Sequence, residues 1–296
     1  MAKENKFQIL KVIRLKINIT AVLPAWKRVE QTIDTINRIK NCRPEPNEII
    51  VAVDGNQIET FERIKKAHPD IRLFLSKDNL GPGGNRNLLI KESKNELIAS
   101  FDDDSYPIDT DYFLKLQTVF KEYSDASVIF SEITEKNTEA PVFRLEEPAY
   151  VKSFVGCGCA YRKKDFLKLQ GYVPLPIAYG CEEADLALQL HEKGMKVLYH
   201  PDLKVFHDTK MTHHANPSIN AGSISNLAIL AYLRYPWLYL PVAFFQIFNR
   251  VWYLITKGRF KGICRGIVNS VITPWKFKQY KKKLTVESFR SYRKHL

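Results

Sequence analysis

Residues 96–107 read ELIASFDDDSYP, an apolar run that passes directly into the three aspartates Asp102, Asp103 and Asp104. The run has the length and composition of a short strand. In open α/β sheets, ligands bind beyond the carboxyl ends of the strands. The stretch therefore predicts both a sheet and the edge of that sheet at which a site is expected.

Short β-rich runs alternate with segments of helical period on both sides of this stretch. Further strands are expected at residues 17–22, 48–53, 71–76 and 126–134. Apolar residues at helical spacing between residues 29 and 39 predict a helix after the first strand. This alternation is typical of an α/β domain with a largely parallel sheet. With 296 residues and 45% hydrophobic content, the chain can bury a sizeable core, which excludes global disorder.

The pattern becomes less regular beyond residue 134. Residues 155–161, VGCGCAY, predict a tight strand or loop that glycine permits, and a helix is expected after Gly180. Two short strands are expected at residues 196–200 and 204–207.

The five cysteines form neither a CxxC pair nor a zinc-site spacing with histidine, so we expect free thiols. Cys157 and Cys159 flank Gly158, and we interpret them as small residues that allow close packing. Residues 1–16 lack the apolar core and the small-residue cleavage site of a signal peptide. A cytoplasmic setting is therefore expected.

The net charge of +13 is concentrated at the C-terminus. Residues 250–296 hold thirteen lysines and arginines against one acid, Glu287, so the rest of the chain carries only about +1. The segment before it is rich in aromatic residues, but its longest uncharged stretch, residues 235–249, has 15 residues and two prolines. A spanning helix needs roughly 20 residues. We predict a segment that lies on an anionic membrane surface; packing of these aromatics on the catalytic domain is the alternative.

Three adjacent carboxylates repel one another, and a hard divalent cation is the obvious counter-charge. Asp102 and Asp104 can approach one ion, because side chains two apart in an extended backbone share a face. A solvated acidic turn is the alternative. His207, which is followed by His213 and His214, offers an imidazole that can complete such a site with Mn²⁺ or Mg²⁺, and nitrogen ligation leans toward Mn²⁺.

Other candidates lie at predicted loops and helix starts. Asp54 begins a turn directly after a strand, and the glycine-rich residues 79–85 leave backbone amides near a helix start, which suits phosphate or ribose. Arg86 follows, as a ligand contact or as an exposed helix residue. Glu182 and Glu183 stand at a helix N-terminus, where the dipole favours ionised acids. One of them can serve as a general base, and helix-dipole complementarity without catalysis is the alternative.

Taken in order, these segments resemble the family 2 glycosyltransferases of the GT-A fold, notably the bacterial rhamnosyltransferase-like branch, over roughly residues 17–207. The matching segments are PAWKR at 24–28 (P-x-x-x-R), VDGN at 53–56 (V-D-x-G-S), NLGPGGNRN at 79–87 (N-x-G-x-x-x-x-R-N), FDDDSYP at 101–107 (the DxD motif) and GCEEADLALQL at 180–190 (G-x-E-D-x-D-L-x-x-R-L). Two positions depart from the pattern: Glu183 stands where the family usually has Asp, and Gln189 where Arg is common. Asp185 of the last segment is interpreted as structural.

The resemblance implies a role for each candidate. Nucleotide-sugar binding falls to Pro24, Asp54, Arg86, Asp102 and Asp103, metal binding to Asp104, His207 and Asp102, and base catalysis to Glu183 with Glu182 as a substitute. The implied reaction is inverting transfer of a sugar from a nucleoside-diphosphate sugar to a glycan or lipid-linked acceptor. Its implied setting is cell-surface polysaccharide synthesis, and the aromatic, basic tail predicts a place at the inner face of the cell membrane.

We accordingly expect a GT-A catalytic domain over residues 1–224 and an aromatic, basic helical tail over residues 225–296. A nucleotidyltransferase that makes sugar nucleotides is an alternative enzyme. A basic nucleic-acid-binding protein is the alternative from another class, but it leaves the acidic segments unexplained, so no nucleic-acid partner is expected. No oligomeric state is predicted.

Overall fold

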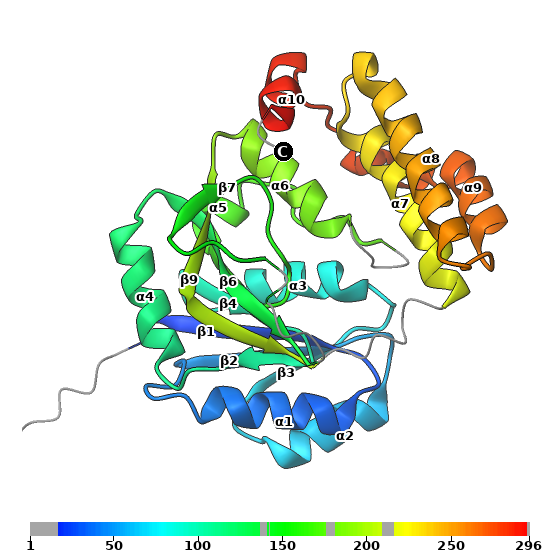
Figure 1. Ribbon diagram of the computed structural model, residues 1–296. Coiled ribbons are helices and arrows are strands. Elements are labelled where there is room, and N and C mark those ends of the chain that lie inside the picture. Colours follow the sequence, from blue (N-terminus) through cyan, green and yellow to red (C-terminus); the bar gives the residue numbers. More distant parts are fainter. Residues whose placement is uncertain (1–16, 137–140, 142, 176–180, 209–215, 295–296) are drawn as a thin grey trace, which may run out of the picture.

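A computed structural model of the chain describes residues 17–136, 141, 143–175, 181–208 and 216–294. These residues form a layered α/β domain followed by a group of C-terminal helices (Figure 1). Of the residues discussed above, Gly180, His213 and His214 lie outside the described ranges.

A mixed sheet forms the centre of the α/β domain. Its strands are β1 (Ile19–Ala25), β2 (Glu48–Val53), β3 (Arg72–Leu75), β4 (Leu97–Ser100), β5 (Ser105–Pro107), β6 (Ala126–Glu135), β7 (Ala149–Val151), β8 (Cys159–Arg162) and β9 (Lys196–His207). The order is β3-β2-β1-β4-β8-β6-β9-β5, with β7 beside β9. β3, β2, β1 and β4 run parallel, and β8 is antiparallel to both neighbours. The predicted α/β class with a largely parallel sheet is confirmed.

Helices cover both faces of the sheet. On one face lie α1 (Val29–Lys40), α2 (Ile58–Ala67) and α4 (Tyr112–Glu122), and on the other α3 (Gly81–Glu92), α5 (Lys163–Phe166) and α6 (Glu182–Glu192). Each face has its own apolar core. All seven residues of β1 are buried, as expected for a parallel strand that is covered on both sides. α1 buries Ile36 and Ile39 at the predicted helical spacing.

The glycine-rich segment is the first turn of α3, so the predicted loop over residues 79–85 is wrong in part. Pro82 is tolerated there because the first N–H groups of a helix have no partner within the helix. Small residues are required because the start of α3 packs closely on residues 172–175 and on Glu182. A Cβ atom on Gly83 would lie 3.0 Å from Glu182 Oε1.

β9, predicted as two short strands, is one continuous strand. It pairs in parallel with β6 along both halves, but the partners of β6 jump from His200 to Lys204. The skipped residues begin with Pro201, which cannot donate to a ladder. The break in the sequence pattern is therefore a local irregularity within one strand.

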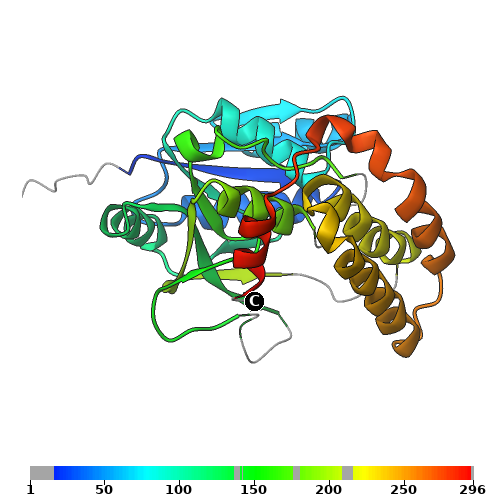
Figure 2. The same ribbon diagram turned by 90° about the horizontal axis from the view of Figure 1, so that it is seen from above.

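The C-terminal helices are α7 (Pro217–Arg234), η2 (Trp237–Tyr239), α8 (Leu240–Thr256), α9 (Ile263–Ile272), η3 (Pro274–Tyr280) and α10 (Val286–Arg293). α8 and α9 pack on α7, and α10 packs on α6. Seen from above, α7, α8 and α9 lie along one side of the α/β domain (Figure 2). The predicted helical C-terminal region is confirmed.

A third apolar core joins these helices to the α/β domain. Cys181 and Leu188 contribute to it from the segment of α6, and Leu233 and Phe289 from the C-terminal helices. The boundary predicted between residues 224 and 225 falls inside α7. A domain boundary placed before α7 would therefore divide the chain between two elements and not within a helix.

Candidate active site

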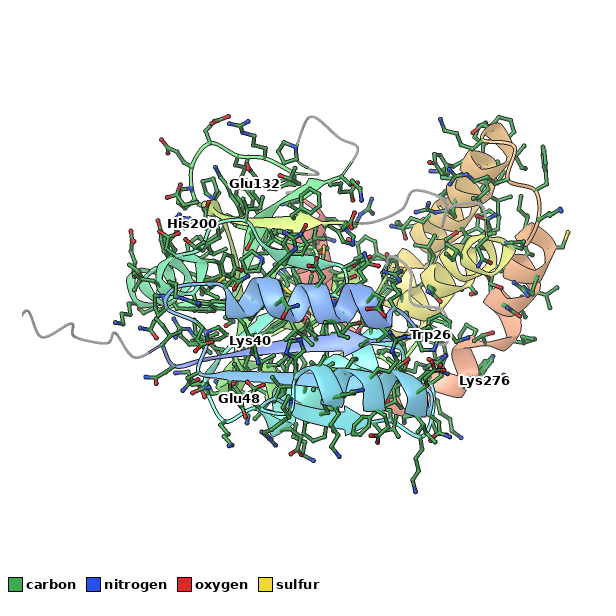
Figure 3. The ribbon with its side chains drawn as sticks, turned by 90° about the horizontal axis from the view of Figure 1, so that it is seen from below. Trp26, Lys40, Glu48, Glu132, His200 and Lys276 are labelled. Carbon is green, nitrogen blue, oxygen red and sulfur yellow. The ribbon has the colours of Figure 1, made fainter. Side chains whose placement is uncertain are left out.

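The carboxyl ends of β1, β2 and β4 meet at the edge of the sheet that faces the C-terminal helices. Figure 3 shows Trp26, which follows β1, at this edge, and Lys40 and Glu48 at the opposite one. A cavity of about 1000 Å³ lies at the carboxyl edge. Its lining includes every candidate residue: Pro24, Asp54, Arg86, Asp102, Asp103, Asp104, Glu182, Glu183 and His207. The fold thus brings together side chains from separate motifs.

Asp54 follows β2 and holds the start of α3. Its two carboxylate oxygens accept hydrogen bonds from the backbone N–H groups of Leu80 and Gly81, each at 2.9 Å. An ionised carboxylate has further lone pairs. Asp54 can therefore accept a donor group of a ligand in the cavity, and its contact with a nucleobase stays a prediction.

Arg86 is a buried residue of α3 with 2% exposure, so the interpretation as an exposed helix residue is wrong. Its guanidinium forms an ion pair with Asp102, and Nε donates to Ser100 Oγ at 3.1 Å. A charge-assisted pair of this kind fixes the orientation of the carboxylate. Arg86 thereby orients Asp102 and places positive charge in the cavity wall.

Arg28, from the loop after β1, bridges the other two aspartates. Its Nη1 lies 3.1 Å from Asp103 Oδ1 and also pairs with Asp104. Burial, reinforced by the charges of Asp104 and Asp102, raises the pKa of Asp103 to about 7. Burial acts the same way on Asp104, but the hydrogen bond from His207 and the charge of Arg28 lower its pKa below the usual value. Asp104 is 4% exposed, which excludes the solvated acidic turn.

His207 lies beside Asp104 because β5 pairs with β9. The register sets Ser105 opposite His207, and His207 Nε2 is 3.3 Å from Asp104 Oδ1. Donor atoms of Asp102, Cys157 and His207 lie within 4.8 Å of one another. Burial disfavours the imidazolium, but hydrogen bonds with Asp104 and Cys157 raise the pKa of His207 to about 11. Asp102, Cys157 and His207 thus offer a carboxylate, a thiol and an imidazole, a donor set that suits a divalent cation of intermediate softness, and the Asp104 carboxylate lies beside the same imidazole.

Glu182 and Glu183 begin α6 and form the acidic wall of the cavity. Burial raises the pKa of both carboxyls, and the charge of Glu183 adds to the effect on Glu182, whose pKa is about 8. Glu182 Oε1 has no hydrogen-bond partner among the described residues. A Cβ atom on Gly156 would lie 2.1 Å from Glu183 Oε1, so only glycine allows this approach. Complementarity to the helix dipole does not require burial, whereas acid–base chemistry gains from a raised pKa.

The cavity also contains residues that were not predicted as site residues, among them Arg28. Cys157 was interpreted as a packing residue, yet its thiol lies beside His207. The two are far apart in the sequence, so no metal-motif spacing marks them. Asn216 and Ser218, at the start of α7, line the cavity from the side of the C-terminal helices. Their position depends on how α7 packs, for which the sequence carries no local signal.

Two family models match the chain. The model described as glycosyl transferase family 2 matches residues 20–169, which is half of the chain. The model described as the N-terminal domain of galactosyltransferase matches residues 142–215. Together they extend over the sheet, the three aspartates and His207.

Two curated relatives are also glycosyltransferases. An uncharacterized glycosyltransferase of Rickettsia bellii is 31% identical over 136 residues, which cover 46% of this chain and 18% of that protein. The glucosyl-dolichyl phosphate glucuronosyltransferase of Haloferax volcanii is 22% identical over 218 residues, covering 65% of this chain and 69% of that protein. The chain thus spans less than a fifth of the length of the first relative.

Solved structures share the fold. GalNAc-T7 with UDP, GalNAc and Mn²⁺ has a TM-score of 0.59 at 13% identity, over 75% of this chain and 49% of that one. The mannosyltransferase PcManGT from Pyrobaculum calidifontis, in complex with GDP-Man and Mn²⁺, has a TM-score of 0.53 at 12% identity, over 93% and 74%. At these identities the likeness shows the fold alone, which is the predicted GT-A fold. With half of its length matched by the family model, the chain belongs to glycosyl transferase family 2.

Proposed function

We propose that the chain transfers a sugar from a nucleotide-sugar donor to an acceptor hydroxyl, with inversion at the anomeric carbon and in dependence on a divalent cation. The observation that supports this most is that Asp104, His207 and Glu183 line one cavity at the carboxyl edge of the sheet. Such a cavity can hold a cation-bound diphosphate beside a carboxyl that accepts a proton.

The cation would be held by Asp104, His207 and Asp102, and the thiol of Cys157 offers a fourth donor. When bound, it would offset the negative charge that develops on the leaving diphosphate. Nitrogen and sulfur donors favour Mn²⁺ over Mg²⁺. GalNAc-T7 and PcManGT, which share the fold, were solved with Mn²⁺.

The donor nucleotide would lie along the wall formed by Pro24, Asp54 and Arg86. We assign the nucleobase to Asp54 and the ribose to Asp102, while Asp103 shapes the same wall. Arg86, which lines this wall, supplies positive charge near the diphosphate. In this assignment, the carboxylates of Asp54 and Asp102 accept hydrogen bonds from the nucleotide with their further lone pairs.

Glu183 would accept the proton of the acceptor hydroxyl. The hydroxyl oxygen forms a bond to the anomeric carbon from the face opposite the diphosphate, and the bond between that carbon and the diphosphate breaks. The proton ends on Glu183. Glu182 can substitute, because its carboxyl lies in the same cavity wall and its pKa is raised as well.

The C-terminal helices carry a surface that suits contact with a membrane. We call it the apolar face, and its members are each at least 57% exposed: Trp237, Phe244, Phe248, Trp252, Val271 and Trp275. α8 buries only Ala243 and Leu254. Exposed apolar patches of this kind mark interaction sites. Packing on the catalytic domain, the alternative for these aromatics, therefore leaves most side chains of α8 without an explanation.

Among the described residues, the segment Trp237–Thr256 is long and apolar enough to cross a membrane by length and composition. The uncharged stretch of residues 235–249 is shorter because the charged residue Arg250 lies within α8. α9 continues the apolar face, and basic residues such as Lys257 and Arg265 lie nearby in the chain. These features favour a helix pair that lies in the interface of an anionic, cytoplasmic membrane surface.

A lipid-linked acceptor fits an enzyme at such a surface. The Haloferax volcanii relative is named for transfer to glucosyl-dolichyl phosphate. We therefore include a lipid-linked glycan acceptor, the rhamnosyltransferase-like branch and a role in cell-surface polysaccharide synthesis in the proposal. No observation favours the nucleotidyltransferase or a nucleic-acid-binding protein.

The proposal is tested by incubating the full chain with Mn²⁺ and a panel of nucleoside-diphosphate sugars, with and without a lipid-linked acceptor. Chromatography of the products is expected to show a nucleoside diphosphate, released faster with acceptor and not at all with a chelator. Release of pyrophosphate would instead identify a nucleotidyltransferase. The anomeric configuration of the product, read by NMR, tests inversion.

A further inference from the structure

Arg234, the last residue of α7, is buried in an ion pair with Asp185 of α6. The two residues are 1% and 3% exposed. Arg234 Nε lies 2.5 Å from Asp185 Oδ1, and Nη2 lies 3.0 Å from Oδ2. Two parallel bonds between a guanidinium and a carboxylate fix the orientation of both partners. The pair therefore fixes the end of α7 against the first turn of α6.

The remaining nitrogen of Arg234 extends this contact to two other segments. Nη1 donates to Gln170 Oε1 at 2.6 Å and to the backbone oxygens of Tyr280 and Lys282 at 3.2 Å and 3.4 Å. One side chain thus joins the segment before α6, α6 itself and the chain after η3. Such a satisfied, buried network is rigid.

Gln189, one turn farther along α6, completes the surroundings of Asp185. Its Nε2 donates to Asp185 Oδ2 at 2.6 Å and to Gly171 O at 3.0 Å. The amide is neutral and leaves the charge of Asp185 uncompensated. The guanidinium that offsets this charge comes from Arg234. The counter-charge of α6 therefore depends on the C-terminal helices.

Asp185 shares the first turn of α6 with Glu182 and Glu183. Its backbone N–H donates to Cys181 O at 2.9 Å. This hydrogen bond closes the helical turn that contains Glu182 and Glu183, so the ion pair holds the turn that carries both acids. A shift of α6 would move the two carboxyls of the cavity wall together with Asp185. A displacement of about 1 Å in a catalytic group can cost about 100-fold in rate.

We propose that Arg234 is a positioning residue: through Asp185 it holds α6 in the orientation that directs Glu182 and Glu183 into the cavity. The C-terminal helices are then part of the catalytic unit and not a detachable anchor. α7 also packs against α8 and α9, so the ion pair links α6 to the helices that carry the apolar face. The inference rests on the proposed function, because it gives the acidic pair a role in catalysis.

Removal of Arg234 alone would leave a buried carboxylate without a counter-charge, which is strongly destabilising. Two double variants avoid this. Arg234→Gln with Asp185→Asn removes both charges and keeps polar groups at both positions. Arg234→Gln with Gln189→Arg gives Asp185 a counter-charge from its own helix at i,i+4 spacing, but no bond to α7. Arg290→Gln, on the exposed side of α10, is the matched control.

The full chains are compared by hydrogen exchange of the amides of residues 182–186 and by steady-state kinetics with donor and Mn²⁺. In both double variants we expect these amides to exchange at least about tenfold faster and kcat to fall at least about tenfold. The KM for the donor should change by less than about threefold, because the nucleotide wall is untouched. The Arg290→Gln control should match the wild type.

Wild-type exchange and kcat in the variant that combines Arg234→Gln with Gln189→Arg would overturn the proposal. Asp185 would then require a counter-charge, but α6 would not require the ion pair to α7. Failure of the proposed function has a different signature: the wild type would release no nucleoside diphosphate from any donor. Exchange at α6 needs no turnover. It therefore reports separately whether Arg234 holds the helix.

Discussion

The cavity and the apolar face differ in opposite ways from an ordinary protein. The cavity buries ionisable side chains, whereas the apolar face exposes aromatic ones. At the cavity, the ionisable residues Arg86, Asp104 and Glu182 are 2%, 4% and 4% exposed. On α8, Phe244 and Trp252 are 68% and 60% exposed. Burial of charge and exposure of aromatic surface both oppose stability. The difference indicates that the two regions bind different partners. The cavity suits an ionic ligand, and the helices suit an apolar surface.

The largest effect is expected at the acidic wall. Glu183→Gln should lower kcat by about 1000-fold, because the amide keeps the shape of the side chain but cannot accept the proton. Donor binding, measured by calorimetry, should be retained. Glu62→Gln, at an exposed position of α2, is the control. Wild-type kcat in the Glu183→Gln variant would assign the base to Glu182.

The apolar face should show the next largest effect. The double variant Phe244→Ala with Trp252→Ala is expected to weaken binding to phosphatidylglycerol vesicles by about 100-fold, since two aromatic side chains lose their burial in lipid. Ile58→Ala removes an apolar side chain that is 56% exposed on α2 and should leave binding unchanged. Co-sedimentation measures both. Equal loss in the two proteins would mean that apolar exposure in general, and not this face, determines binding.

The buried carboxyl of Glu182 predicts how stability depends on pH. Burial raises its pKa from 4.5 to about 8, so between these values the native state holds a proton that the unfolded chain has released. The contribution of this group to the free energy of unfolding therefore falls as pH rises through that window. Glu182→Gln should stabilise the protein by roughly 2 kcal/mol at pH 8 and by nearly nothing at pH 4.

Urea unfolding followed by circular dichroism at the two pH values measures this difference. The same difference between variant and wild type at both values would show that Glu182 is not the group responsible. Glu182 would then be ionised, like an acid at the N-terminus of an ordinary helix.

The smallest effect is expected at Cys157. Cys157→Ser should lower the preference for Mn²⁺ over Mg²⁺ by about fivefold, because an oxygen donor replaces the softer sulfur. Calorimetry with each ion in the presence of a nucleoside diphosphate measures the preference. With Co²⁺ as a probe, the wild type should show a sulfur-to-metal absorption band that the variant lacks. A band in both proteins would remove the thiol from the donor set.

Features that depend on local sequence were predictable. Asp54 and the three aspartates end apolar runs, so their position at the carboxyl edge followed from the strand pattern alone. The start of α6 was equally local, since acids after Gly180 are typical of a helix N-terminus. The order of these motifs along the chain then predicted the family and the GT-A fold.

Features that depend on packing between distant segments were not predictable. Cys157 reaches His207 only because β8 and β9 belong to one sheet, and Arg234 reaches Asp185 only because α7 packs on α6. The glycines of α3 were predicted as a loop because the close contacts that require them come from Glu182 and from the segment before α6, which includes Tyr172 and Leu175. In each case the partner that decides the structure is remote in sequence.

The proposed function depends most on Asp104 and His207, which would hold the cation that binds the donor diphosphate. Calorimetric titration of UDP and GDP, with and without Mn²⁺, tests it in the wild type, in Asp104→Asn and in His207→Ala. In the wild type, Mn²⁺ should tighten binding of one of the two nucleotides by about 100-fold. Both variants should lose that gain and keep the weak binding measured without the ion. The same gain from Mn²⁺ in either variant would show that the substituted residue does not hold the cation.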